Sequence, residues 1–372
     1  MTYGNYPDLT NVRKVLVVKL RHLGDVLLTS PVFTNLKKRM PEAQIDAYIY
    51  SDSFPMLEGH PAISHLIGYD KGIKKLSFLS RLKKEFSLLW KIRKEKYDLV
   101  INLTEGDRGA IVCKMSGAKI LVGPESDKKT KVYTHIIKKC HSLRHTVERN
   151  LDALRVIGIF PSIEERELYY HISESAMSKI KHLLQDANFS PKEFYLIHPA
   201  SRWRFKCWPE EKVREVIQTL LSQEKKVVIT SGGDKEEKEM VDRIIQGISH
   251  PNLLNLSGKV SLKELGSLIH LCKGLLCVDS VSFHMASALK ASVTVLFGPT
   301  SDVTWGPWNN PNAQVLTQPF SCRPCYSDGC AGSKKSDCLA TLPVQRVLTA
   351  LLKLEKGSVT ETQTETQTGW RQ

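Results

Sequence analysis

The sequence predicts an α/β protein with two doubly wound, Rossmann-like halves that face each other across a central cleft. Apolar runs typical of buried strands alternate with amphipathic helical segments, first over residues 15–158 and again from residue 194. A charged stretch after Pro161 separates the two series, and 372 residues are enough for two cores. We place the boundary near residues 171–192. We expect an N-terminal domain over 1–178, a C-terminal domain over 179–355 and a disordered tail over 356–372, which is rich in Thr and Gln.

The first half begins with a strand over 15–18 and a turn that runs from Lys19 to Asp25 into an apolar helix. This strand-to-helix corner holds one glycine, Gly24, and one carboxylate. Dinucleotide-binding folds need G-x-G-x-x-G at this place, and P-loops need G-x-x-x-x-G-K-[ST]. The turn therefore matches neither nucleotide motif. The strands QIDAYIY, YDLVINL and AKILVG, with helices over 76–96 and 145–158, complete this half.

The second half contains a strand, polar turn, helix and strand between Leu276 and Thr300. In such units ligands collect beyond the carboxyl ends of the strands, where a helix N-terminus offers free N–H groups to a phosphate. Asp279 and Ser280 lie at that edge. The other expected elements are a strand ending near residue 198, helices over 209–223 and 235–246, the strand KVVITSGG and a last amphipathic helix over 342–354.

The composition bounds the class of protein. A hydrophobic content of 41% and a charged content of 25% are typical of a soluble globular chain, and no apolar run approaches the ~20 residues that span a bilayer. The N-terminus carries no apolar signal segment, so we expect a cytoplasmic protein. The net charge of +14 implies an anionic partner, which nucleic acid, a nucleotide or an anionic membrane surface would each satisfy.

The loop over 198–209 gathers cations after a strand and before a helix. Ser201, Arg202 and Lys206 there can clamp a pyrophosphate, whose charge grows as it leaves. The alternative is a solvated basic loop with locally packed tryptophans. Glu236 follows another strand and can accept ribose hydroxyls, although a solvated helix surface explains it as well.

Three further candidates also have structural explanations. Asp25 and Asp279 can each be a helix N-cap, and His284 can be a core histidine on a buried helix face. The chain holds no D-x-D pair, so it lacks the usual carboxylates for a metal-bound nucleotide sugar. Cations and helix dipoles would then have to stabilise the leaving group.

The nine cysteines favour reduced thiols over a disulfide scaffold, because their number is odd and most are scattered through expected elements. Four of them form a C-x2-C-x4-C-x7-C arrangement, which leaves a zinc site open. The second pair is spaced more widely than in zinc ribbons, so reduced cysteines in a Gly- and Ser-rich loop are the favoured state. These four are Cys322, Cys325, Cys330 and Cys338.

The segment over 71–96 combines an apolar helical stripe with many Lys and Arg residues. We expect the apolar side to pack on the domain. The basic side, with Lys83 and Lys84, is then free to meet anionic lipid head groups or an acidic acceptor. The stripe consists of Leu76, Leu79, Leu82, Phe86, Leu89 and Trp90.

Together these motifs resemble the lipopolysaccharide heptosyltransferase family, and most of all its heptosyltransferase III branch. The resemblance covers about residues 13–354, and the order and spacing of the motifs make it specific. The matching motifs are K-x-x-x-x-G-D (Lys19, Gly24, Asp25), K-x-W-P (Lys206, Trp208, Pro209), GG-x-x-E (Gly232, Gly233, Glu236), D-[ST]-x-x-x-H (Asp279, Ser280, His284) and Phe297-Gly298-Pro299-Thr300.

The resemblance implies a GT-B fold and the transfer of L-glycero-D-manno-heptose from ADP-heptose to the anionic inner core of lipopolysaccharide. It further implies a third heptose added to the second, with inversion, without a metal or cofactor, and at the cytoplasmic face of the inner membrane. Asp25 resembles the general base and Lys206 the cation on the donor phosphate. Asp279 resembles a ligand of the donor sugar. We expect donor contacts at Ser201, Arg202, Glu236, Asp279, Ser280, Val281 and His284, and acceptor contacts at Lys19, Arg21, His22, Gly24, Lys83 and Lys84.

One position departs from the family pattern. Val281 stands where the family usually has glycine, and its Cβ can shift the phosphate or require a different loop path. Another ADP- or UDP-sugar transferase of the same fold is the alternative function. A nicotinamide-dependent oxidoreductase lacks support because the first turn has too few glycines, and no nucleic-acid motif accompanies the positive charge.

Overall fold

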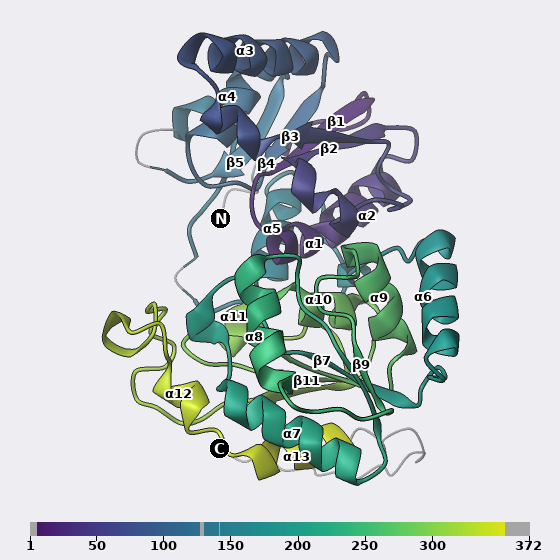
Figure 1. The fold of residues 1–372 in the computed structure, drawn as a ribbon. Helices are drawn as coiled ribbons and strands as arrows, with labels where there is room; N and C mark the ends of the chain where they lie inside the picture. The colour runs from purple at the N-terminus through teal and green to yellow at the C-terminus, as the bar shows by residue number, and fades with distance from the viewer. Residues whose placement is uncertain (1–5, 127–129, 141, 354–372) are drawn as a thin grey trace, which may run out of the picture.

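The computed structural model describes residues 6–126, 130–140 and 142–353, and shows two α/β halves, one above the other in Figure 1. Each half contains a six-stranded parallel sheet covered by helices. This architecture confirms the predicted fold class. The tail predicted to be disordered, 356–372, lies outside the described residues.

The first sheet has the strand order β3-β2-β1-β4-β5-β6. Its central strands consist almost entirely of buried Val, Leu and Ile residues, as expected for a parallel sheet with both faces covered. The strands are β1 (Lys14–Lys19), β2 (Gln44–Tyr50), β3 (His65–Tyr69), β4 (Leu99–Asn102), β5 (Ile120–Pro124) and β6 (His135–Ile137). The helices are α1 (Leu23–Leu27), α2 (Ser30–Arg39), α3 (Phe78–Lys94), α4 (Asp107–Ser116) and α5 (Thr146–Arg155).

The second sheet repeats this plan with the order β12-β11-β10-β7-β8-β9. Its strands are β7 (Phe194–His198), β8 (Lys226–Ile229), β9 (Leu253–Asn255), β10 (Gly274–Val278), β11 (Val293–Leu296) and β12 (Ala313–Leu316). Its helices are α6 (Glu174–Asp186), α7 (Glu210–Ser222), α8 (Lys235–Ile245), α9 (Leu262–Leu271), α10 (Val281–Ala288), α11 (Asp302–Trp305), α12 (Asp337–Ala340) and α13 (Val344–Lys353).

Both sheets reverse their strand order next to the first strand of each half. The reversal lies between β1 and β4 in one sheet and between β7 and β10 in the other. Open α/β sheets bind ligands at such reversal points, beyond the carboxyl ends of the strands. The strand order of the two sheets therefore predicts a ligand-binding site at the turns that follow β1, β7 and β10.

The two halves share one buried apolar cluster, which runs from the first sheet through α1, α5 and α10 to the second sheet. Polar contacts join them as well: His145 Nε2 lies 2.9 Å from the Gly306 carbonyl oxygen, and Thr146 Oγ1 donates to the Thr304 carbonyl at 3.0 Å. Helix α6 packs against α9, and the predicted division between residues 178 and 179 falls inside α6. That division stays a prediction.

Helix α3 corrects one expectation. Its apolar stripe was predicted to pack on the domain, yet Leu79 is 77% and Phe86 64% exposed. Of the predicted stripe, Leu89 does pack against the core, but the rest of the inward face is different: Ile92 is buried, and Glu85 accepts hydrogen bonds from Tyr69 and Arg108. Because this polar anchor fixes the rotation of the helix, the large apolar side chains point outward.

Candidate active site

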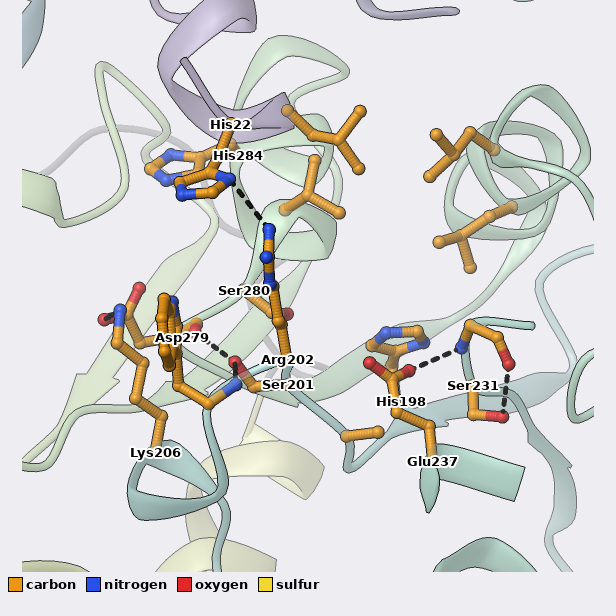
Figure 2. Close-up of a pocket in the computed structure, with 18 of the residues that line it drawn as sticks. His22, His198, Ser201, Arg202, Lys206, Ser231, Glu237, Asp279, Ser280 and His284 are labelled. Carbon is orange, nitrogen blue, oxygen red and sulfur yellow. Dashed lines mark hydrogen bonds and ion pairs between the residues drawn. The ribbon is translucent and has the colours of Figure 1, made fainter. Parts of the chain in front are cut away.

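A cavity of about 740 Å³ lies between the two halves, at the reversal points of both sheets. Its walls come from the turn after β1, the loop after β7, the segment after β8 and the start of α10 (Figure 2). Most of the predicted site residues line it together. They are His22, Gly24, Asp25, Ser201, Arg202, Lys206, Asp279, Ser280, Val281 and His284.

Asp25 lies in the first turn of α1 and lines the cavity. The N-cap of α1 is His22, so Asp25 is not the helix cap that the sequence left open. Within the described residues, its carboxylate takes part in no hydrogen bond or ion pair. Asp25 is therefore placed as a carboxylate that can accept a proton from a group bound in the cavity.

Gly24 and His284, which are 260 positions apart in the sequence, meet across the interface between the halves. A Cβ built on Gly24 would lie 2.7 Å from Cδ2 of His284, closer than side chains tolerate. The contact belongs to the packing of α1 against α10. Only glycine lets these helices approach this closely, so the helix that carries Asp25 packs against the helix that follows Asp279.

His284 is buried, and its burial lowers its pKa well below the usual value, so the ring is neutral at physiological pH. Its Nδ1 atom is buried without a hydrogen-bond partner among the described residues. Buried polar atoms in proteins are normally hydrogen-bonded. His284 is thus a buried histidine with one unpaired ring nitrogen, and its side chain forms part of the cavity wall.

Asp279 is the centre of a buried polar cluster. Its Oδ2 atom lies 2.7 Å from Lys206 Nζ and accepts a hydrogen bond from Thr300 Oγ1 at 2.6 Å, while Ser201 Oγ donates to its main-chain oxygen. The N-cap of α10 is Ser280 rather than Asp279. The carboxylate therefore holds Lys206 and the FGPT turn in place instead of capping the helix.

The basic loop after β7 reaches across to the first half. Arg202 NH1 lies 3.2 Å from Nδ1 of His22, as the dashed line in Figure 2 shows. Burial and the neighbouring guanidinium lower the pKa of His22. A neutral His22 ring can then accept this hydrogen bond, and the loop lines the cavity rather than open solvent.

The carboxylate that lines the cavity near β8 belongs to Glu237, one position after the predicted Glu236. Glu237 accepts a hydrogen bond from the Gly232 amide at 2.8 Å, and burial raises its pKa. The Glu236 side chain is 74% exposed and pairs loosely with Arg204 at 3.7 Å. The sequence motif located this segment, but only the helix rotation selects which Glu faces inward.

Helix α10 starts at Val281, and Ser280 and Val281 at its N-terminus, where a helix has free N–H groups, line the cavity. Val281, the departure from the family pattern, is not among the residues with positive φ. An L residue therefore fits this backbone without strain, and its amide is available to an anion.

Several predicted acceptor residues lie outside the cavity lining. Lys19 is buried beneath the turn, where its Nζ donates to the Leu103 carbonyl and to Asn150 Oδ1, both at 3.1 Å, and burial lowers its pKa to about 8. Arg21 pairs with Glu105 at the surface. Lys83 and Lys84 are exposed on α3, at the far end of the first half in Figure 1.

Some residues that the sequence analysis did not predict also line the cavity. His198 contacts Thr230 Oγ1 at 3.0 Å, and burial lowers its pKa to about 4. Asp52 and Lys71 form an ion pair at 2.6 Å on the side of the first half. The carboxyl-end position after a strand is a signal that could have pointed to Asp52 and Lys71.

The cysteine-rich loop contributes a further residue, Tyr326, to the cavity. Its backbone amide bonds to the Pro299 carbonyl at 2.9 Å, and Arg323 Nε donates to the Gly298 carbonyl at 2.6 Å. Cys338 is buried, while Cys322, Cys325 and Cys330 are exposed free thiols. The described residues contain no group of three or more side chains with metal-ligand geometry.

Two facing α/β halves with a shared cavity at their strand ends form the GT-B type architecture, and this is the class of fold to which the protein belongs. Residues 86–335 match glycosyltransferase family 9 (heptosyltransferase). The chain belongs to this family, and it is an enzyme that transfers a sugar. The family match rules out the oxidoreductase alternative.

The chain is 31% identical to lipopolysaccharide heptosyltransferase 3 of Escherichia coli over 92% of this chain and 99% of that protein. A second heptosyltransferase 3, from Escherichia coli strain K12, is 32% identical over 90% of this chain and 96% of that one. Among solved structures, E. coli ADP-heptose LPS heptosyltransferase II superposes with a TM-score of 0.76 at 20% identity, covering 93% and 99% of the two chains. That structure supports the shared fold.

Proposed function

We propose that this protein transfers L-glycero-D-manno-heptose from ADP-heptose to the inner core of lipopolysaccharide, as the third heptose on the second. The observation that carries the proposal is the meeting of the Asp25 turn with the Asp279–Lys206 cluster across the contact between Gly24 and His284. The similarity to heptosyltransferases 3 over more than 90% of the chain supports the sugar and the acceptor class.

In this reaction the acceptor hydroxyl attacks the anomeric carbon of the heptose while Asp25 takes the hydroxyl proton. The new bond forms as the bond from the anomeric carbon to the β-phosphate oxygen breaks, and ADP leaves with the electron pair. Attack from the side opposite to ADP inverts the configuration in a single displacement. Asp25 comes from the first half and the cations Arg202 and Lys206 come from the second half, which supports a base and a leaving group on opposite sides of the sugar.

The leaving ADP gains negative charge at its β-phosphate. Lys206, Arg202 and the N-terminus of α10 at Val281 line the cavity and can stabilise that charge. Glu237 lines the cavity, and its carboxylate can accept hydrogen bonds from ribose hydroxyls; the side chain of His284 forms part of the cavity wall near the start of α10.

The test is transfer from ADP-heptose to lipopolysaccharide extracted from a strain that lacks this protein, with a chelator present and the acceptor read by mass. A gain of one heptose, located on the second heptose by linkage analysis, supports the whole proposal. If UDP- or other ADP-sugars react faster than ADP-heptose, the proposed donor is wrong while the class stands. A gain at another hydroxyl overturns the proposed acceptor.

A further inference from the structure

Helix α3 carries large apolar side chains that the fold leaves exposed. Phe78, Leu82, Phe86 and Trp90 follow one another at four-residue spacing, so they lie on one stripe of the helix, with Leu79 beside it. Each of the five is at least half exposed. We call these five residues the outer face of α3. Proteins seldom expose apolar patches of this kind unless a partner covers them.

The first half does not need this face for its own packing. Glu85 and Ile92 attach the helix from another side, where the Glu85 carboxylate receives two hydrogen bonds from Arg108 at 2.8 and 2.7 Å. The Arg108 guanidinium in turn lies 3.9 Å from the centre of the Tyr69 ring. The outer face of α3 therefore does not contribute to the packing of the first half.

The positive charge around the outer face of α3 favours an anionic partner. Helix α3 contains six Lys and Arg residues and one Glu, and all six cations are exposed. Lys94 Nζ lies 5.6 Å from the centre of the Trp90 ring, so cation and apolar groups are next to one another. These cations are Arg81, Lys83, Lys84, Lys91, Arg93 and Lys94.

We propose that the outer face of α3 binds the surface of an anionic lipid bilayer. Phe78, Leu82, Phe86 and Trp90 enter the boundary between head groups and acyl chains, and the surrounding cations meet the anionic head groups. The helix lies in the plane of the surface, and no helix in the described part of the chain is long and apolar enough to cross a membrane. A second copy is a poor partner, because two such faces would bring like charges together.

The position of α3 connects this surface to the cavity. A short 3₁₀ helix, Lys71–Lys75, begins at the cavity-lining Lys71 and leads toward α3, which starts at Phe78. Figure 1 shows α3 on the outer end of the first half, away from the second half. Docking through α3 therefore attaches the protein by the first half and leaves the second half free to exchange its ligand with solution. This proposal does not depend on the identity of the donor sugar.

The experiment measures binding of the full chain to vesicles that contain phosphatidylethanolamine and phosphatidylglycerol but no lipopolysaccharide, by co-sedimentation. We expect the double variants Phe86→Ser with Trp90→Ser, and Lys91→Glu with Lys94→Glu, each to reduce the partition coefficient on the order of tenfold or more. The matched control is Lys181→Glu with Lys235→Glu. It makes the same charge change at exposed positions of α6 and α8 in the second half.

Two further measurements keep the test sharp. Thermal unfolding and ADP binding must be unchanged in the α3 variants, which separates lost docking from lost folding. Vesicles with brominated acyl chains should quench the wild type more than Trp90→Phe, because that variant removes the tryptophan placed in the lipid. The proposal is wrong if the wild type stays in the supernatant, or if the α3 variants bind as well as the control. It is also wrong if those variants convert a dimer into a monomer.

Discussion

The two halves contribute to the cavity in different ways. On the side of the second half, polar groups are bonded to one another before any ligand arrives: Lys206 and Asp279 pair at 2.7 Å with side chains only 18% and 7% exposed. On the side of the first half, the corresponding pair, Lys71 and Asp52, is 40% and 59% exposed. The carboxylate of Asp25 on this side has no bonded partner among the described residues.

This difference has a physical meaning. A buried pair holds its geometry because breaking it strands a charge in a poorly solvated place, whereas an exposed pair is worth about 1 kcal/mol or less. The second half is therefore a preorganised site, suited to a phosphate whose charge develops during the reaction. The first half contributes the unpaired carboxylate of Asp25 and a more exposed wall, which agrees with the proposed binding of a larger acceptor on this side.

The sharpest test of the comparison is Asp25→Asn. We expect turnover to fall by about 10²–10⁴-fold, because the amide cannot accept the acceptor proton, while ADP binding stays unchanged. The measurement is single-turnover transfer beside calorimetric ADP titration. A near-normal rate in the variant would show that Asp25 is not the base. It would also contradict the proposed difference in function between the two halves.

The second test addresses the preorganised side through Lys206→Ala. We expect turnover to fall by roughly 10²–10³-fold, because the charge on the leaving phosphate loses its cation. ADP affinity should fall as well, in contrast to Asp25→Asn. The variant also leaves the buried Asp279 carboxylate without its cationic partner. We expect this to lower the free energy of unfolding by about 3–5 kcal/mol, as for other broken buried ion pairs. The double variant Lys206→Met with Asp279→Leu should recover stability but not activity, and recovered activity would contradict the role.

The third test concerns the contact that joins the two sides. Gly24→Ala places a Cβ 2.7 Å from His284, and we expect a loss of about 1–3 kcal/mol in unfolding free energy from this overpacking. Gly233→Ala is the matched control, because a Cβ there meets no atom within 4 Å. Chemical denaturation measures both. Two results would argue against a tight contact between Gly24 and His284. One is an equal loss of unfolding free energy in Gly24→Ala and Gly233→Ala; the other is that adding His284→Ala to Gly24→Ala recovers none of that loss.

The fourth test separates two adjacent carboxylates. Glu237→Gln should weaken ADP binding about tenfold, as expected for a lost charged hydrogen bond, whereas Glu236→Gln should leave it unchanged. Burial raises the pKa of Glu237, so the wild-type affinity should fall on acidification at a higher pH than an ordinary Glu would give. The Glu237→Gln variant should lack this dependence. Calorimetric titrations across pH decide, and a loss in Glu236→Gln instead would reverse the assignment.

Much of this molecule follows from local sequence patterns. The alternation of buried strands and amphipathic helices determined the two parallel sheets, and polar turns after the strands pointed to Asp25, Lys206 and Asp279. These signals survive folding because chain topology places the carboxyl ends of parallel strands along one edge. The order of the motifs along the chain was also sufficient for the family.

Tertiary structure alone decided the rotation and pairing of side chains. It selected Glu237 rather than Glu236, buried Lys19 beneath the turn and turned the apolar stripe of α3 outward, because the Glu85 anchor fixed that helix. It also brought Gly24 against His284. Periodicity shows that a helix has an apolar side but not which neighbour covers it, since that depends on contacts between residues far apart in the chain.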